Sequence, residues 1–325
     1  MKTSNSILKK LIPGLLLGLL VMILITLFGD LKSVSLTMLS FQWKYFPLAL
    51  AFTLINYTLR FLKWHYYLKR IGASQIPWKT SLRMFVAGFP LAVTPGKAGE
   101  VLKGLWIQQA GGAPIAKGVS VVVAERISDG LAVLALSTLG VIAYPRYWYA
   151  FMIILAGLLS VIIISQIRPL AYLLLDGMDK LPLIRRISHL LREFYEGSFT
   201  LFNPGATLLA VGLGTISWLG EGIGFYFLLV GLGFTPSPAL AGEAVFILAF
   251  STVIGAVSAL PGGLGATEAS IAGMLSFILQ SIPSQAAAAT LLIRLATLWF
   301  GVFLGLITWT FSLDLIGLKT GNSVK

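Results

Sequence analysis

The chain has no cysteine, only two histidines and few charged residues. Without cysteine it can form no disulfide, no thiolate nucleophile and no Cys-containing metal site, and its redox compartment stays undecided. Charged residues make up 11% of the 325 positions, against roughly 25% in soluble domains. Hydrophobic residues make up 57%, so water cannot be the main solvent of this chain. We therefore expect a polytopic integral membrane protein.

Acidic residues are half as numerous as basic ones, 12 against 24, which gives a net charge of +12. On a chain this apolar, Lys and Arg are expected at the cytoplasmic ends of membrane spans rather than on a soluble nucleic-acid-binding face. Motifs for metals, nucleotides and acyl-group chemistry are missing from the sequence. The predicted partner is membrane lipid, with no nucleic acid, no metal and no cofactor, and we do not expect an enzyme.

Long hydrophobic runs predict an all-α transmembrane bundle, because about 20 apolar residues cross a hydrocarbon core of roughly 30 Å. Cations before the first run and after the last place both termini in the cytoplasm, with the protein in the plasma (inner) membrane. The expected bundle is a single domain over residues 1–325. It has about six full spans, which we place at 11–28, 43–62, 119–143, 148–167, 206–230 and 286–311.

Two further apolar segments are interrupted by proline and glycine, and we expect them to form broken or re-entrant helical hairpins. The first, 82–109, is broken by Thr94-Pro95-Gly96-Lys97-Ala98-Gly99-Glu100, so each half is too short to cross alone. The second is broken at Leu260-Pro261-Gly262-Gly263-Leu264-Gly265. Between the halves of the chain, 168–203 carries several cations and is expected to be a cytoplasmic amphipathic helix or a solvated linker helix.

The sequence also contains a weak internal repeat, with 43–145 as the first unit and 206–312 as the second. An offset of 161 residues pairs Arg60 with Glu221, and Pro95-Gly96 then corresponds to Pro261-Gly262. After a change of register, Glu100 corresponds to Glu268 and Arg126 to Arg294, with 26 residues from Glu to Arg in both units. The span with Arg60 is predicted to run inward and the one with Glu221 outward, so the repeat is inverted.

Charged residues inside predicted spans need a partner, a water-filled cavity or a function, because each costs roughly 2.5–3.5 kcal/mol on insertion scales. Glu125 and Asp129 are four residues apart, which places them on one helical face. Arg126 could bridge to Asp129 or point at a lipid headgroup. A structural role, in which the ion pairs only hold helices together, is about as well supported as a role in binding substrate.

The broken segments offer backbone groups to a ligand, because proline frees hydrogen-bonding groups and glycine permits close approach. Helix N-termini after such loops suit phosphate, and Lys97 adds a full charge to the first loop. Glu100 and Glu268 have two readings. They could cap the following helices, or they could couple protons or contact a headgroup.

Taken together, these residues resemble a known family, the flippase-like membrane domain related to the transmembrane region of lysylphosphatidylglycerol synthases. The resemblance covers nearly the whole chain, and it implies a domain that translocates or handles aminoacylated phospholipids, isoprenoid-linked sugars or other envelope lipids. The soluble aminoacyltransferase domain is not in this sequence, so we do not expect lysyl-lipid synthesis. The motifs that carry the resemblance are Arg60 with Trp64, the 94–100 loop, Glu125-Arg126 with Asp129, the 260–265 loop with Glu268, and Arg294.

The leading hypothesis is a lipid flippase or transporter for a lipid with a polar phospho- or isoprenoid-linked headgroup. One alternative is an intramembrane lipid-modifying enzyme with Glu125 or Asp129 as general base. Another is a non-catalytic scaffold for a partner lipid synthase or glycosyltransferase. The candidate translocation residues are Arg60, Thr94, Pro95, Gly96, Lys97, Glu100, Glu125, Arg126, Asp129, Glu221, Pro261, Gly262, Gly263, Gly265, Glu268 and Arg294.

Overall fold

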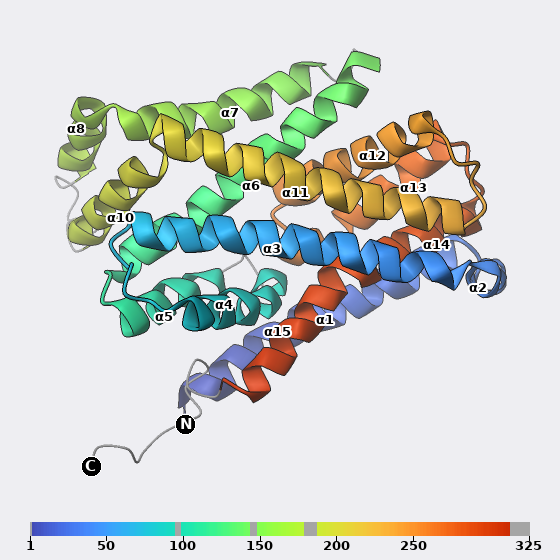
Figure 1. Ribbon diagram of the computed structural model, residues 1–325, viewed down its shortest axis with the longest axis horizontal. Coiled ribbons are helices and arrows are strands. Elements are labelled where there is room, and N and C mark those ends of the chain that lie inside the picture. Colours follow the sequence, from blue (N-terminus) through green and yellow to red (C-terminus); the bar gives the residue numbers. More distant parts are fainter. Residues whose placement is uncertain (1, 95–98, 144–147, 179–186, 313–325) are drawn as a thin grey trace.

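The computed structural model describes residues 2–94, 99–143, 148–178 and 187–312 (Figure 1). Within these ranges the chain is helical and contains no strand, which confirms the predicted all-α polytopic bundle. Pro95, Gly96 and Lys97 of the first predicted loop lie outside the described residues.

The helices follow one another in an order that is similar in the two halves. The first half contains α1 (Lys2–Phe28), α2 (Leu31–Ser40), η1 (Trp43–Tyr45), α3 (Phe46–Arg70), α4 (Trp78–Ala87), η2 (Phe89–Val93), α5 (Val101–Gly111) and α6 (Ile115–Ala143). Next come α7 (Trp148–Gln166), α8 (Arg168–Met178) and α10 (Ser188–Leu201). The second half contains α11 (Pro204–Gly231), α12 (Pro238–Val257), η5 (Pro261–Gly263), α13 (Ala266–Ile278), α14 (Pro283–Arg294), the π-helical turn η6 (Leu295–Trp299) and α15 (Phe300–Thr310).

Five segments in the described residues are long and apolar enough to cross a membrane by themselves. A sixth forms if α7 and α8, which meet at a bend of 91°, count as one broken span. α6 was also predicted to cross, and its 29 residues exceed the length that a hydrocarbon core requires. Large apolar side chains on the outside of the bundle, such as Leu208 and Phe277, are well exposed and suit lipid contact. The five segments are 11–28, 43–70, 204–231, 238–257 and 283–310.

α3 and α11 lie side by side in the middle of the molecule and run in opposite directions (Figure 1). Near the start of α3, the Gln42 N–H donates to the carbonyl of Gly231 at the end of α11. At their midpoints, the Asn56 side chain donates to the Ser217 carbonyl at 3.1 Å. At the other end, Arg70 donates to Thr200, just before α11 begins. This antiparallel pair therefore forms the centre of the bundle.

The same turn ends both central helices. Gly72 after α3 and Gly233 after α11 have φ angles of 89° and 95°, a left-handed conformation that glycine adopts without steric cost. In each turn the following residue closes a backbone hydrogen bond five residues back, from Ala73 to Leu68 and from Phe234 to Leu229. Glycine at these two positions therefore fixes where the central helices stop.

The two broken segments meet inside the bundle, where η2 packs against η5. In the first segment α4 and α5 have 10 and 11 residues, too short to cross alone, as expected. The second segment differs, because α12 is an unbroken helix of 20 residues and only α13, with 13, is short. Its break lies after Val257, so α12 can cross by itself.

The segment predicted to link the halves forms α8 and α10, which pack against each other. Arg192 binds Asp176 at 2.7 Å, and Arg168 lies 3.4 Å from Glu196. All four side chains are at least one-third exposed, as suits a solvated or membrane-surface element. A short helix that the sequence analysis did not foresee, α2, begins where Asp30 accepts a hydrogen bond from the Ser33 N–H.

Close helix contact depends on glycine where α5 crosses α6. A Cβ on Gly118 would lie 2.7 Å from the Cα of Gly104, nearer than real Cβ atoms approach backbone. We predict that Gly118→Ala lowers the free energy of unfolding by about 1–3 kcal/mol, because the helices must separate. Gly157→Ala on α7, where no atom lies within 4 Å, is the matched control. Reversible unfolding in mixed detergent micelles measures both, and equal stability of the two variants would contradict this packing.

Candidate functional site

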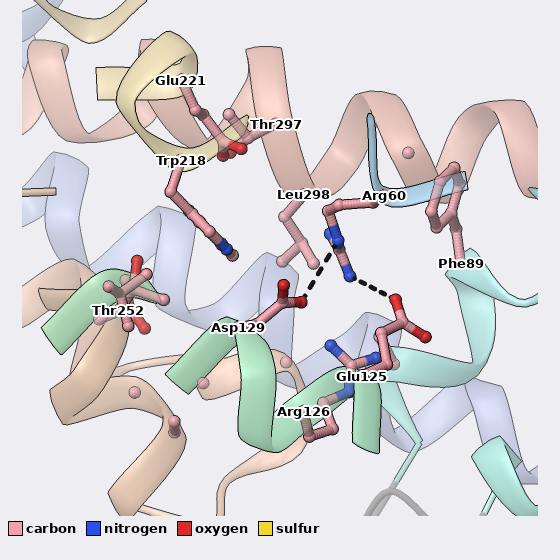
Figure 2. A pocket seen from close by; sticks show the side chains of 18 of the residues that line it. Arg60, Phe89, Glu125, Arg126, Asp129, Trp218, Glu221, Thr252, Thr297 and Leu298 are labelled. Carbon is pink, nitrogen blue, oxygen red and sulfur yellow. Dashed lines mark hydrogen bonds and ion pairs between the residues drawn. The ribbon is translucent and has the colours of Figure 1, made fainter. Parts of the chain in front are cut away.

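A cavity of about 270 Å³ lies between the two halves, at the level of the broken segments. Its wall combines α3, η2, α5 and α6 of the first half with α11, α12, η5, η6 and the neighbouring helices of the second. Figure 2 shows Arg60, Glu125 and Asp129 close together on one side, with Glu221 apart from them beyond Trp218. Charged side chains within an apolar bundle make this cavity the candidate site.

Glu125 and Asp129 lie on one face of α6 and both bind Arg60 from α3. The Arg60 Nη2 atom is 3.0 Å from Glu125 Oε1, and its Nε atom is 3.4 Å from Asp129 Oδ2. Lys63 Nζ lies 2.5 Å from Asp129 Oδ1, and Lys103 Nζ lies 3.7 Å from Glu125 Oε2. Each carboxylate therefore faces two cations, which offsets the cost of burying it.

Arg126 does not bridge to Asp129, although the spacing within α6 allowed it. It binds Glu100 of α5 instead, with Nε 3.1 Å from Oε2 and Nη2 2.9 Å from Oε1. Its guanidinium therefore makes a two-pronged contact with the carboxylate, the strong geometry for this pair. Glu100 and Arg126, which are 26 residues apart in the sequence, thus connect the start of α5 directly to α6.

The second half contains the corresponding pair. Arg294 Nε lies 2.5 Å from Glu268 Oε1, and Arg294 Nη2 donates to the Gly262 carbonyl at 3.0 Å. Each broken segment is therefore tied by a Glu–Arg pair to the long helix that follows it. In the second half the arginine also holds the backbone of the break itself.

The two glutamates differ in how they meet their helix N-termini. Glu268 Oε2 accepts a hydrogen bond from the Gly265 N–H at 2.7 Å, so it does cap α13. Glu100 occupies the N-cap position of α5 but makes no capping hydrogen bond with its side chain. The carboxylate of Glu268 therefore occupies the N-terminus of α13, where a phosphate was expected. The side chain of Glu100 binds Arg126 instead of capping α5.

Glu221 is the exception among the acids of the cavity. Its side chain lies on the cavity wall and the residue is 6% exposed. Among the residues that the structure describes, it makes no hydrogen bond and no ion pair. A buried carboxylate without a direct partner is costly, and such groups cluster at functional positions.

The loop residues of the prediction fall into two groups. Gly262 and Gly263 line the cavity with φ angles of 60° and 68°. Thr94, Pro261 and Gly265 are not part of its wall. Thr94 instead holds its own turn together, because its Oγ1 donates to the Leu91 carbonyl and accepts from the Gly99 N–H.

Two lysines of the site escaped the sequence analysis. Lys63 belongs to a run of aromatic and basic residues that indicates the cytoplasmic end of a span, yet it is 1% exposed and binds Asp129. Lys103, 3% exposed, reaches Glu125 and lies 5.2 Å from the Trp64 ring centroid. Both follow a predicted site residue by three positions, Arg60 and Glu100, and this spacing on one helical face could have identified them.

Breaking one buried pair should be far more damaging than removing both of its members. We predict that Arg294→Gln, which leaves Glu268 buried alone, destabilises the fold by about 3–5 kcal/mol. The double variant Arg294→Gln with Glu268→Gln should lose less stability than Arg294→Gln alone, and therefore clearly less than the sum of the two single changes. A double-mutant cycle of unfolding in detergent measures this coupling.

The exposed pair Arg168–Glu196 is the control for that cycle, and its coupling should stay within about 1 kcal/mol. Equal coupling energies for the buried and the exposed pair would show that the buried pair does not stabilise the fold as predicted.

The chain is similar to known membrane proteins over most of its length. The model of the lysylphosphatidylglycerol synthase TM region matches residues 15–305. A UPF0104 membrane protein of Methanothermobacter thermautotrophicus is 24% identical over 312 residues, which is 89% of each chain. No solved structure matches. Because the family model covers most of the sequence, the chain belongs to the membrane-lipid-related family of the lysylphosphatidylglycerol synthase transmembrane region.

Proposed function

We propose that this protein moves a lipid with a polar headgroup between the two leaflets of the membrane. The observation that carries the proposal is the charged cavity at the meeting point of the two broken segments, walled by both halves of the chain. A headgroup in transit needs polar partners inside the hydrocarbon layer, while its acyl chains can stay in lipid. Transporters built from inverted repeats bind substrate at such broken helices.

An inverted repeat with its pseudo-two-fold axis between α3 and α11 fits the contacts of these helices. Residues related by such an axis lie opposite each other where the axis passes. Asn56 and Ser217 are in contact, and they are separated by 161 residues, the same offset that pairs Arg60 with Glu221. The matching glycine turns after the two helices have this offset as well. We therefore propose alternating access, in which one half rocks against the other around the cavity.

The two alternative functions have less support. A scaffold that only holds a partner synthase would need a fully paired charge cluster and no cavity, whereas a cavity is present and Glu221 has no ion-pair partner among the described residues. An intramembrane enzyme would need Glu125 or Asp129 to take up a proton. Each of these carboxylates is already held by two cations, so neither is free to contact a substrate proton.

The proposal includes the orientation of the protein in the membrane, with both termini in the cytoplasm. The beginning of α1 and the end of α15 lie at the same end of the molecule (Figure 1), as expected if both termini face one side of the membrane. The cations near these termini favour the cytoplasmic side of the plasma membrane.

Reconstitution into liposomes tests the function directly. Fluorescent phospholipids with anionic, zwitterionic and cationic headgroups, and isoprenoid-linked phosphates, are each assayed for exchange between leaflets by chemical quenching of the outer leaflet. We expect accelerated exchange for at least one headgroup class compared with protein-free liposomes. The same rate with and without protein, for every lipid in the panel, would contradict a lipid transporter.

Removing the charge pair on the first broken segment should stop transport without unfolding the protein. In the double variant Arg126→Gln with Glu100→Gln, no uncompensated charge stays buried, so thermal stability should change little. Leaflet exchange of the transported lipid should fall at least tenfold, because Arg126 is the cavity cation most open to a headgroup, with 36% of its side chain exposed. Arg168→Gln with Glu196→Gln is the control, and unaltered exchange in the Arg126 variant would remove this pair from the mechanism.

A further inference from the structure

The charges that the described residues place in and around the cavity balance, and Glu221 is the one of them without an ion-pair partner. Charged residues that line the cavity, or pair with one that does, comprise five cations and five carboxylates in the described part of the chain. Nine of them are in ion pairs. The cations are Arg60, Lys63, Lys103, Arg126 and Arg294, and the carboxylates are Glu100, Glu125, Asp129, Glu221 and Glu268.

Protonation of Glu221 would therefore change the summed charge of these ten described residues from zero to +1. The other four carboxylates are already held in ion pairs by cations. Glu125 and Asp129 each face two cations, and Glu100 and Glu268 each face an arginine. Glu221 has no such direct partner, so a proton there displaces no ion pair.

The surroundings of Glu221 on α11 come from several helices. Arg60 and Tyr57 approach from α3, Asp129 from α6 and Arg294 from the end of α14. α12 contributes only uncharged side chains to the cavity, among them Thr252. The η1 turn meets the far end of α11 at Gly231, where its Lys44 is exposed. Two arginines and one aspartate are thus the charges that act on Glu221 across the cavity.

A monoanionic headgroup and a proton on Glu221 complement each other in this setting. An ionised Glu221 would repel a phosphate in a low-dielectric cavity, whereas a protonated carboxyl can donate a hydrogen bond to it. The proton also supplies the one positive charge that a phosphodiester monoanion needs for a neutral complex. The cavity cation with the most exposed side chain, Arg126, is the group that can contact the phosphate.

We propose that Glu221 takes up a proton when the cavity binds a lipid with a monoanionic phosphodiester headgroup, so that headgroup and proton occupy the cavity together. This inference rests on the proposed function and specifies its substrate class and its coupling. In a cell, a proton gradient would then bias the direction of lipid movement, because the cavity must bind headgroup and proton together on one side of the membrane and release both on the other. By linkage, the headgroup also strengthens proton binding by the same factor by which the proton strengthens headgroup binding.

Proton uptake on binding is the direct test. The purified full-length protein in detergent is titrated with short-chain dihexanoylphosphatidylglycerol by calorimetry, between pH 6 and 8, in buffers of different ionisation enthalpy. We expect uptake of up to one proton per lipid bound. Affinity should weaken by up to about tenfold per pH unit as pH rises, over the range in which Glu221 is deprotonated in the empty cavity.

Variants identify the proton's location. Glu221→Gln should bind the lipid with no proton uptake and no pH dependence over that range, because the amide is permanently neutral. Glu221→Asp keeps a carboxyl and should keep the uptake. Glu243→Gln is the matched control, a half-buried glutamate of α12 outside the cavity wall, and it should behave as the unaltered chain does.

Several results would overturn the inference. These are failure of the unaltered protein to bind dihexanoylphosphatidylglycerol, binding without proton uptake, uptake that persists in Glu221→Gln, and loss of uptake in a Glu221→Asp variant that still binds. Equal binding and uptake with dihexanoylphosphatidylcholine would show that the anionic charge is not selected. Equal behaviour with glycerophosphoglycerol, the same phosphodiester without acyl chains, would assign the site to a soluble ester. Linked binding without any leaflet exchange in liposomes would sustain the inference and refute transport.

Discussion

Ion pairing inside the hydrocarbon layer determines how the helices of this bundle can be arranged. Charged groups in a bundle with lipid-exposed apolar faces are tolerated only if they meet partners of opposite sign or water. Here the pairs connect helices that are distant in sequence, α3 with α6 and α5 with α6 in the first half, and α13 with α14 in the second. These contacts fix where the broken segments can lie, and they create a polar interior that an apolar bundle would otherwise lack.

The same pairs explain why a cavity can exist at the centre. The broken segments pack against the antiparallel helices α3 and α11 through α4 and α12, and each is held by an arginine from the following long helix. Glycines at 262 and 263 adopt left-handed conformations that keep the second break compact. The π-helical turn after Arg294 contributes Thr297 and Leu298 to the wall, and such turns are frequent at functional sites. Among the described residues, ion pairs thus surround one carboxylate, Glu221, that has no ion-pair partner itself.

Much of this arrangement was accessible from the sequence, and the reasons for the failures are physical. Hydropathy and cations predicted the bundle, and matched Glu and Arg positions predicted related roles in the two halves. Helical periodicity placed Glu125 with Asp129, but it could not reveal that Arg126 binds Glu100, because that partner lies on another helix. Lys63 was not identified, because its neighbours have the composition of a membrane interface, while its helical phase directs it to Asp129. The length of α12 was missed because its break lies near one end.

Alternating access requires that the cavity open to each side of the membrane in turn. The natural chain has no cysteine, so a single Thr252→Cys in the cavity wall provides one reactive thiol. Its labelling by a membrane-impermeant maleimide is measured in right-side-out and inside-out vesicles, with Leu208→Cys on the lipid-exposed surface as the unreactive reference. Alternating access predicts that the cavity thiol is labelled from both sides. Labelling from one side only, or from neither, would contradict it.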